Sequence, residues 1–138
     1  MNTILKNILA VIAGWLIGST VNMLLIKIGS SIFPIKGVDS NDMEALADIM
    51  PNLSSEYFIF PFLGHAFGSL VGALIVTLIA TNHKMKLALV IGVLFLVGGI
   101  DVNYMLPGPI WFTIADITLA YIPMAYIGGK LGIRIVKK

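Results

Sequence analysis

Four polar side chains stand inside otherwise apolar stretches of this sequence: Asn22, His65, Asp101 and Asp116. A charged group in hydrocarbon costs about 2.5 to 3.5 kcal/mol even on the gentlest scale, so such groups are expected to face the protein interior and to pair. An imidazole beside two carboxylates can hold a proton near neutral pH, accept a cation, or act as acid and base. We therefore take these four residues as the candidate ligand- or ion-binding site.

The same residues support two other hypotheses. Asp101 and Asp116 could share one proton around a water molecule, as aspartyl enzymes do, which would make the protein an intramembrane hydrolase. Alternatively, the polar layer only fixes the register of the helices, as in a structural or accessory subunit. The sequence has no His-x-x-His or Glu-x-x-His spacing, so neither a metal nor a cofactor is predicted, and a non-enzymatic role is favoured.

The elements that must position these residues are apolar and fit a membrane protein. Hydrophobic residues make up 58% of the chain and charged residues 12%, whereas soluble domains have about half and about a quarter. The chain lacks cysteine, which excludes disulfides, thiolate metal sites and cysteine nucleophiles. The net charge of +2 lies at the chain ends and in loops, so the expected partner is the lipid bilayer and not a nucleic acid.

Four apolar stretches are long enough to cross a hydrocarbon layer of ~30 Å at a rise of ~1.5 Å per residue. They cover about 4–28, 57–80, 87–106 and 109–133 of a single transmembrane domain, 1–138. The first stretch is too long for the ~7–15-residue core of a signal peptide, so it is expected to be a retained helix. The connections after the second and third stretches are short and force antiparallel neighbours. The predicted fold is an all-α, polytopic, antiparallel bundle of four transmembrane helices.

The loop at 29–56 is expected to carry a short amphipathic helix. Asn41 followed by Glu44 resembles a capping box. Apolar residues then recur at the i, i+3, i+4 and i+7 positions of a helix, at Met43, Leu46, Ala47 and Met50. We expect the apolar side of this helix to lie on the bilayer surface or over the mouth of the bundle.

Basic residues predict the orientation. With both termini in the cytoplasm, seven of the nine lysines and arginines lie inside, namely Lys6, Lys84, Lys86, Lys130, Arg134, Lys137 and Lys138. This agrees with the positive-inside rule and predicts an inner (plasma) membrane protein with cytoplasmic N- and C-termini. Counted along the helices, the four polar residues then lie roughly 9 to 12 Å below the outer surface. The pocket they form is expected to open outward.

Glycines and a proline indicate where helices touch and bend. The GxxxG pairs are Gly14 with Gly18, Gly64 with Gly68, Gly68 with Gly72, and Gly128 with Gly132. Such faces allow close packing within one bundle or between chains, and their number favours a homo-oligomer or a membrane protein partner. Pro123 predicts a kink in the fourth helix, because the carbonyl of Leu119 loses its amide donor.

Two tetrapeptides, Gly98-Gly99-Ile100-Asp101 and Thr113-Ile114-Ala115-Asp116, are faintly similar to the aspartate motifs of the lipoprotein signal peptidases. No arginine follows Asp101, Thr113 stands where that family has asparagine, and the connection between the helices is too short for that family's extracytoplasmic elements. We therefore do not assign the chain to this family. The sequence predicts a small integral membrane protein whose outward-facing pocket binds or transports a proton, a cation or a small solute.

Overall fold

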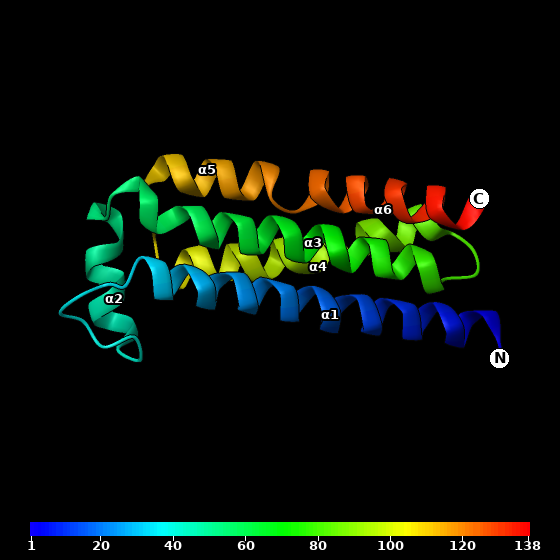
Figure 1. The fold of residues 1–138 in the computed structure, drawn as a ribbon, viewed down its shortest axis with the longest axis horizontal. Helices are drawn as coiled ribbons and strands as arrows, with labels where there is room; N and C mark the ends of the chain where they lie inside the picture. The colour runs from blue at the N-terminus through cyan, green and yellow to red at the C-terminus, as the bar shows by residue number, and fades with distance from the viewer.

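The computed structural model describes all residues, 1–138, and consists of helices without strands. Its elements are α1 (Thr3–Ile32), α2 (Met43–Ile49), α3 (Ile59–Ile79), α4 (Lys84–Met105), α5 (Ile110–Leu119) and α6 (Ile122–Lys137), with 3₁₀ turns at Met50–Asn52 and Ser55–Phe58. The long helices lie side by side, with both termini at one end and α2 at the other (Figure 1). We call these the terminal end and the loop end.

Four helical segments are long and apolar enough to cross a membrane, as the sequence predicted. They are Thr3–Ile32, Ser55–Ile79, Lys84–Met105 and Ile110–Lys137. The first of them runs past its predicted end at 28, because Gly29, Ser30 and Ser31 remain helical. The hydroxyls of Ser30 and Ser31 donate to the carbonyls four residues earlier, at 3.0 and 3.1 Å, and so are satisfied within the helix. The loop consequently starts later than predicted.

The short helix predicted in the loop is present as α2, but its predicted cap is wrong by one residue. Asp42 caps the helix, because its Oδ1 accepts from Ala45 N at 3.0 Å. Asn41 instead donates its backbone N–H to Asp39 Oδ1 at 2.9 Å. This local turn places Asn41 outside the helix, and the Asn41–Glu44 capping box does not form.

Helices α1 and α3 meet through glycines. A Cβ added at Gly14 would lie 2.6 Å from the Gly72 carbonyl oxygen, and one added at Gly18 would lie 2.5 Å from the Gly68 oxygen. Only glycine permits two backbones to approach this closely. The GxxxG faces of these two helices are therefore packed against each other within the chain.

The GxxxG face of α6 packs against α3 in the same way. A Cβ at Gly128 would overlap the Leu70 carbonyl, and one at Gly132 would lie 2.9 Å from the Leu74 carbonyl oxygen. All the GxxxG faces are thus occupied inside the chain. A contact with another protein through them would require these helices to separate.

Small apolar residues fill the space between α1, α3, α4 and α6 toward the terminal end. They are at most 2% exposed: Ala10, Ala73, Val76, Ala80, Ala88, Ile91 and Ala125. At the margin of this cluster the Lys84 ammonium donates to the carbonyls of Thr77 at 2.7 Å and of Ala80, which satisfies the end of α3. The terminal half of the molecule is therefore closely packed.

The last apolar segment is broken into α5 and α6. Helix α5 stops at Leu119, a turn follows at Ala120 and Tyr121, where Tyr121 has φ −111° and ψ −78°, and α6 begins with Pro123 in its first turn. Figure 1 shows the interruption. The predicted kink at Pro123 is confirmed and amounts to a complete break, because proline supplies no N–H to the preceding turn. The break leaves Tyr121 only 1% exposed.

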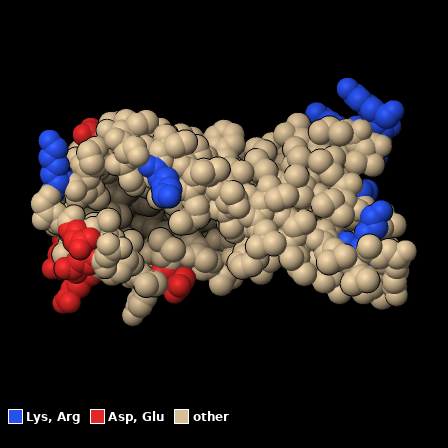
Figure 2. Space-filling view, turned by 60° about the horizontal axis from the view of Figure 1, so that its bottom comes forward, with Lys and Arg blue, Asp and Glu red and all other residues tan.

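Charged side chains separate along the molecule. Lysine and arginine lie at both ends, with the larger group at the terminal end, whereas aspartate and glutamate lie toward the loop end beside a hollow (Figure 2). Between the two ends the visible face carries no charge. This distribution matches the one expected for a segment of hydrocarbon thickness between two aqueous ends.

The glycine contacts predict a stability effect. Gly18→Ala should destabilise the protein by about 1–3 kcal/mol, because the new methyl group forces α1 away from the Gly68 carbonyl. Met23→Ala, at an exposed position of the same helix, is the matched control and should change little. Thermal unfolding of the purified protein in detergent, followed by circular dichroism, measures both. Equal losses in the two variants would contradict the packing described.

Candidate functional site

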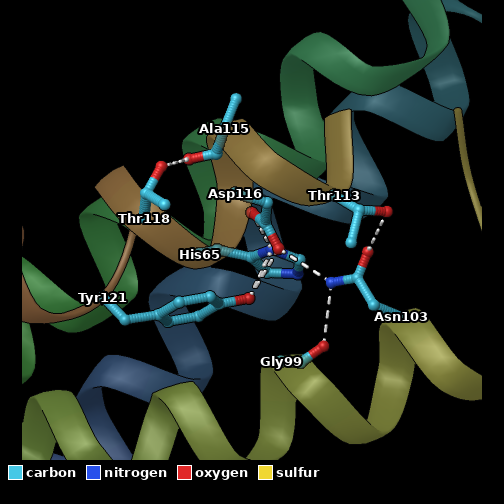
Figure 3. Close-up of polar contacts among 8 residues, drawn as sticks. All are labelled: His65, Gly99, Asn103, Thr113, Ala115, Asp116, Thr118 and Tyr121. Carbon is cyan, nitrogen blue, oxygen red and sulfur yellow. Dashed lines mark hydrogen bonds and ion pairs between the residues drawn. The ribbon is translucent and has the colours of Figure 1, made fainter. Parts of the chain in front are cut away.

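A buried carboxylate joins α3 to the broken fourth segment. Asp116 of α5 is 0% exposed, and its Oδ1 lies 2.7 Å from Nδ1 of His65 on α3. Its Oδ2 accepts from the Tyr121 hydroxyl at 2.8 Å, and the Tyr121 oxygen is also 2.9 Å from His65 Nδ1 (Figure 3). Because an ionised carboxylate can only accept, His65 Nδ1 carries the proton and donates it to Asp116.

Helix α4 adds a third donor to the same carboxylate. Asn103 Nδ2 donates to Asp116 Oδ2 at 3.1 Å and to the Gly99 carbonyl at 2.8 Å. The hydroxyl of Thr113 donates to Asn103 Oδ1 at 3.3 Å and so fixes the orientation of this amide (Figure 3). Asp116 therefore accepts from three side chains. This full set of donors offsets the cost of burying its charge.

The Tyr121 side chain reaches this cluster across Gly99 of α4, where no side chain blocks it. A Cβ at Gly99 would overlap the Tyr121 hydroxyl, so only glycine leaves room for the phenol at this position. The neighbouring Gly98 has open space where its Cβ would be. Gly99 therefore admits the tyrosine, and the break before Pro123 turns the tyrosine toward it.

His65 also lines a pocket of about 200 Å³. It lies between α1 and α4, and its lining residues are Trp15, Ser19, Asn22, His65, Leu94, Phe95, Gly98, Gly99, Val102 and Tyr121. We call it the His65 pocket. Both hydrogen bonds of the imidazole use Nδ1, so Nε2 has no partner within the chain. A histidine held in this way presents the lone pair of Nε2 as an acceptor.

Two more polar side chains lining the His65 pocket lack partners. Thr20, Ser30 and Ser31 of α1 donate their hydroxyls to carbonyls of their own helix, whereas the Ser19 hydroxyl makes no hydrogen bond. Asn22 likewise makes none, and its Oδ1 is buried without a partner. An unpaired buried polar atom such as Asn22 Oδ1 is rare and calls for a water molecule or a ligand.

A larger hollow of about 510 Å³ lies at the loop end, where Figure 2 shows the surface hollowed. Ile26 of α1 and Leu106, the residue that follows α4, line it. They lie four residues, about one helical turn, beyond Asn22 and Val102 of the His65 pocket. The two cavities therefore follow one another along the seam between α1 and α4.

The structure brings together only part of the residues predicted from sequence. His65 and Asp116 are hydrogen bonded, and Asn22 lines the pocket that His65 also lines. Asp101 is exposed and makes no hydrogen bond or ion pair, so its expected pairing with Asp116 is not formed. Asp101 stands two positions after the inward-facing Gly99, and two positions along a helix turn the side chain by roughly 200°. Asp101 therefore points away from the interior.

Sequence reasoning missed Tyr121, Asn103 and Thr113. The proximity of Tyr121 to Asp116 depends on the break between α5 and α6. Asn103 and Thr113 carried a signal, because they stand at similar distances on either side of Pro107-Gly108-Pro109. A tight hairpin brings such positions to one level of the bundle.

No family model matches the chain, and comparison with curated proteins and with solved structures gives no match either. The class of the protein is therefore given by its fold and site. It is an all-helical protein with four helices long and apolar enough to span a membrane. A buried Asp–His–Tyr cluster lies beside a small cavity within it.

The cluster predicts different outcomes for the two aspartates. Asp116→Asn should lower stability by about 3–5 kcal/mol. The NH₂ group of the new amide would face one of the three donors, His65, Asn103 or Tyr121, and two donors cannot form a hydrogen bond with each other. Asp101→Asn, exposed and unbonded, is the control and should stay within about 0.5 kcal/mol. Unfolding in detergent measures both. An Asp116→Asn protein as stable as the control would show that the carboxylate does not hold the cluster together.

A second pair tests the entry of the tyrosine. Gly99→Ala should displace the Tyr121 hydroxyl from Asp116 and His65, and it should cost about 1–3 kcal/mol through the lost hydrogen bonds. Gly98→Ala meets open space and should be neutral or more stable by up to about 1 kcal/mol. The same unfolding assay compares these adjacent variants. The described geometry requires them to differ.

Proposed function

We propose that this chain is a multi-pass protein of the inner (plasma) membrane in which the His65 pocket binds a small polar solute and exchanges a proton with it. The four spanning helices would form an antiparallel bundle with cytoplasmic termini. The apolar length of the helices supports insertion. The basic residues gathered at the terminal end support the orientation (Figure 2).

One observation carries this proposal. His65 is held at Nδ1 by the buried Asp116 at 2.7 Å, its Nε2 has no partner within the chain, and the residue lines a pocket together with Ser19 and Asn22. The lone pair of Nε2 can accept a proton from an O–H or N–H group of a solute. The Asp116 carboxylate would stabilise the imidazolium that results, since it lies against the opposite nitrogen.

The geometry favours a proton or an uncharged solute over a metal cation. Asp116 is fully buried, already accepts from three side chains and does not line the pocket, so its carboxylate is not available to an ion there. The two-aspartate hydrolase would need Asp101 and Asp116 to face one water, and exposed Asp101 gives it no support. A purely structural polar layer would be fully paired, whereas Ser19, Asn22 and Nε2 of His65 are not.

Transport is a second candidate, and the broken fourth segment favours it. Interrupted helices near the middle of the membrane are common at transporter binding sites. Here the interruption between α5 and α6 lies directly at Tyr121, which bonds to the site. The packed core around Ala73 and Ile91 closes the terminal half, so transport would require a second conformation.

Nitrogen NMR of the histidine rings tests the binding site. His83→Gln leaves His65 as the only histidine, so its ring nitrogens can be assigned directly. We expect neutral His65 to carry its proton on Nδ1, although neutral imidazole in water prefers the Nε2–H form. Asp116→Asn should weaken this preference. A neutral His65 protonated at Nε2 would contradict the proposed site.

Proton flux distinguishes transport from binding. Protein reconstituted into vesicles containing a pH-sensitive dye is given a proton gradient. If it transports, wild type and His83→Gln should dissipate the gradient and His65→Asn should not, because only His65 lies at the cavity. If the wild-type protein shows no proton flux but His65 keeps its proton on Nδ1, the site binds a solute without transporting protons.

A further inference from the structure

The His65 pocket reaches the outer surface of the molecule between α1 and α4. Two of its lining residues, Trp15 on α1 and Leu94 on α4, are 49% and 43% exposed. They belong to the outer apolar surface of the molecule, where Leu16 and Val97 are also exposed. In a membrane-spanning protein this surface faces acyl chains. The pocket between α1 and α4 therefore opens toward the hydrocarbon layer.

The lining of the pocket describes the headgroup it accepts. His65 Nε2 is an acceptor, the Ser19 hydroxyl both donates and accepts, and Asn22 adds an unbonded side-chain amide. Phe95, Val102 and the two rim residues supply apolar walls. At about 30 Å³ for each water-sized group, the pocket holds roughly six or seven such groups.

The charges near the pocket exclude a charged headgroup. The only ionisable groups lining it are His65 and Tyr121, and both are engaged with Asp116. No lysine, arginine or free carboxylate lines it to balance an ionic ligand. Moving an unbalanced charge to this depth would cost several kcal/mol. An uncharged group with at least one hydroxyl satisfies the lining instead.

We propose that the His65 pocket binds the uncharged, hydroxyl-bearing headgroup of a membrane amphiphile, such as a long-chain alcohol or an acylglycerol. The molecule enters between α1 and α4, its hydroxyl donates to His65 Nε2 and accepts from Ser19 or Asn22, and its hydrocarbon tail stays in the bilayer. This inference rests on the proposed function, because it requires both membrane insertion and the free Nε2.

The two tryptophans of the chain provide a reporter and a control. Trp15 lines the pocket, whereas Trp111 lies on α5 against Phe58 and Phe112, outside it. Both are about half exposed, at 49% and 52%, so lipid reaches them similarly. Trp111→Phe leaves Trp15 as the only fluorophore, and Trp15→Phe leaves Trp111.

The experiment measures quenching of each tryptophan in phosphatidylcholine vesicles. The probes are a long-chain alcohol brominated near its hydroxyl and the matching brominated hydrocarbon without the hydroxyl. The alcohol should quench Trp15 saturably, at a mole fraction about tenfold lower than the hydrocarbon, which corresponds to about one net hydrogen bond. The two probes should quench Trp111 equally. Equal quenching of Trp15 by both probes would overturn the proposal.

A matched pair of variants, introduced into the Trp111→Phe background, tests the pocket residues. Ser19→Ala should shift saturation of Trp15 quenching about tenfold, whereas Thr20→Ala, an exposed neighbour bonded to the Leu16 carbonyl, should not. Equal shifts would overturn the assignment of Ser19. A short-chain brominated alcohol that saturates Trp15 from water as effectively would overturn the membrane amphiphile as the source.

The tautomer of His65 distinguishes failure of the ligand proposal from failure of the proposed function. If His65 keeps its proton on Nδ1 but the alcohol shows no preference for Trp15, only the identity of the ligand is wrong. If neutral His65 instead carries its proton on Nε2, the binding site itself is wrong, and the ligand inference fails with it.

Discussion

The buried carboxylate of Asp116 imposes a constraint that organises the loop-end half of this molecule. A carboxylate with no exposed surface must receive hydrogen bonds from all sides or give up its charge. His65, Tyr121 and Asn103 supply them from three separate helical segments. Much of the local backbone serves this arrangement. The break before Pro123 directs Tyr121 inward, and Gly99 leaves space for its hydroxyl.

The length of the apolar stretches and the free-energy cost of unpaired polar groups were sufficient to predict much of the fold. Twenty-odd apolar residues in a row have few alternatives to a long helix, and a proline removes one N–H wherever it stands. The pairing of His65 with Asp116 follows similarly, because both are expensive to leave unpaired in an apolar helix. Depth along the helices placed them at one level without knowledge of any contact.

The direction in which a side chain points from its helix was harder to predict, since a shift of one residue rotates it by about 100°. Asp101 lies on the outer face of α4, whereas Asn103, two positions further along the helix, faces inward. The cap of α2 moved from Asn41 to Asp42 for a comparable local reason. The glycine pairs indicated close helix contacts but not which helices make them. Only the three-dimensional arrangement shows that α1, α3 and α6 use them on one another.

The asymmetry around His65 argues most strongly for a binding role. On the Nδ1 side every polar atom of the cluster has a partner, down to Thr113, which orients the amide of Asn103. In the pocket of about 200 Å³ that His65 also lines, the Ser19 hydroxyl and the Asn22 amide make no hydrogen bond, and Asn22 Oδ1 is buried. A layer that only fixed helix register would gain stability by pairing these groups, since an unpaired buried atom such as Asn22 Oδ1 costs about 1–3 kcal/mol. Here the hydrogen-bonded Asp116 cluster fixes the imidazole, while the pocket beside it keeps unpaired polar groups. This arrangement suits the binding of a group that the chain itself does not provide.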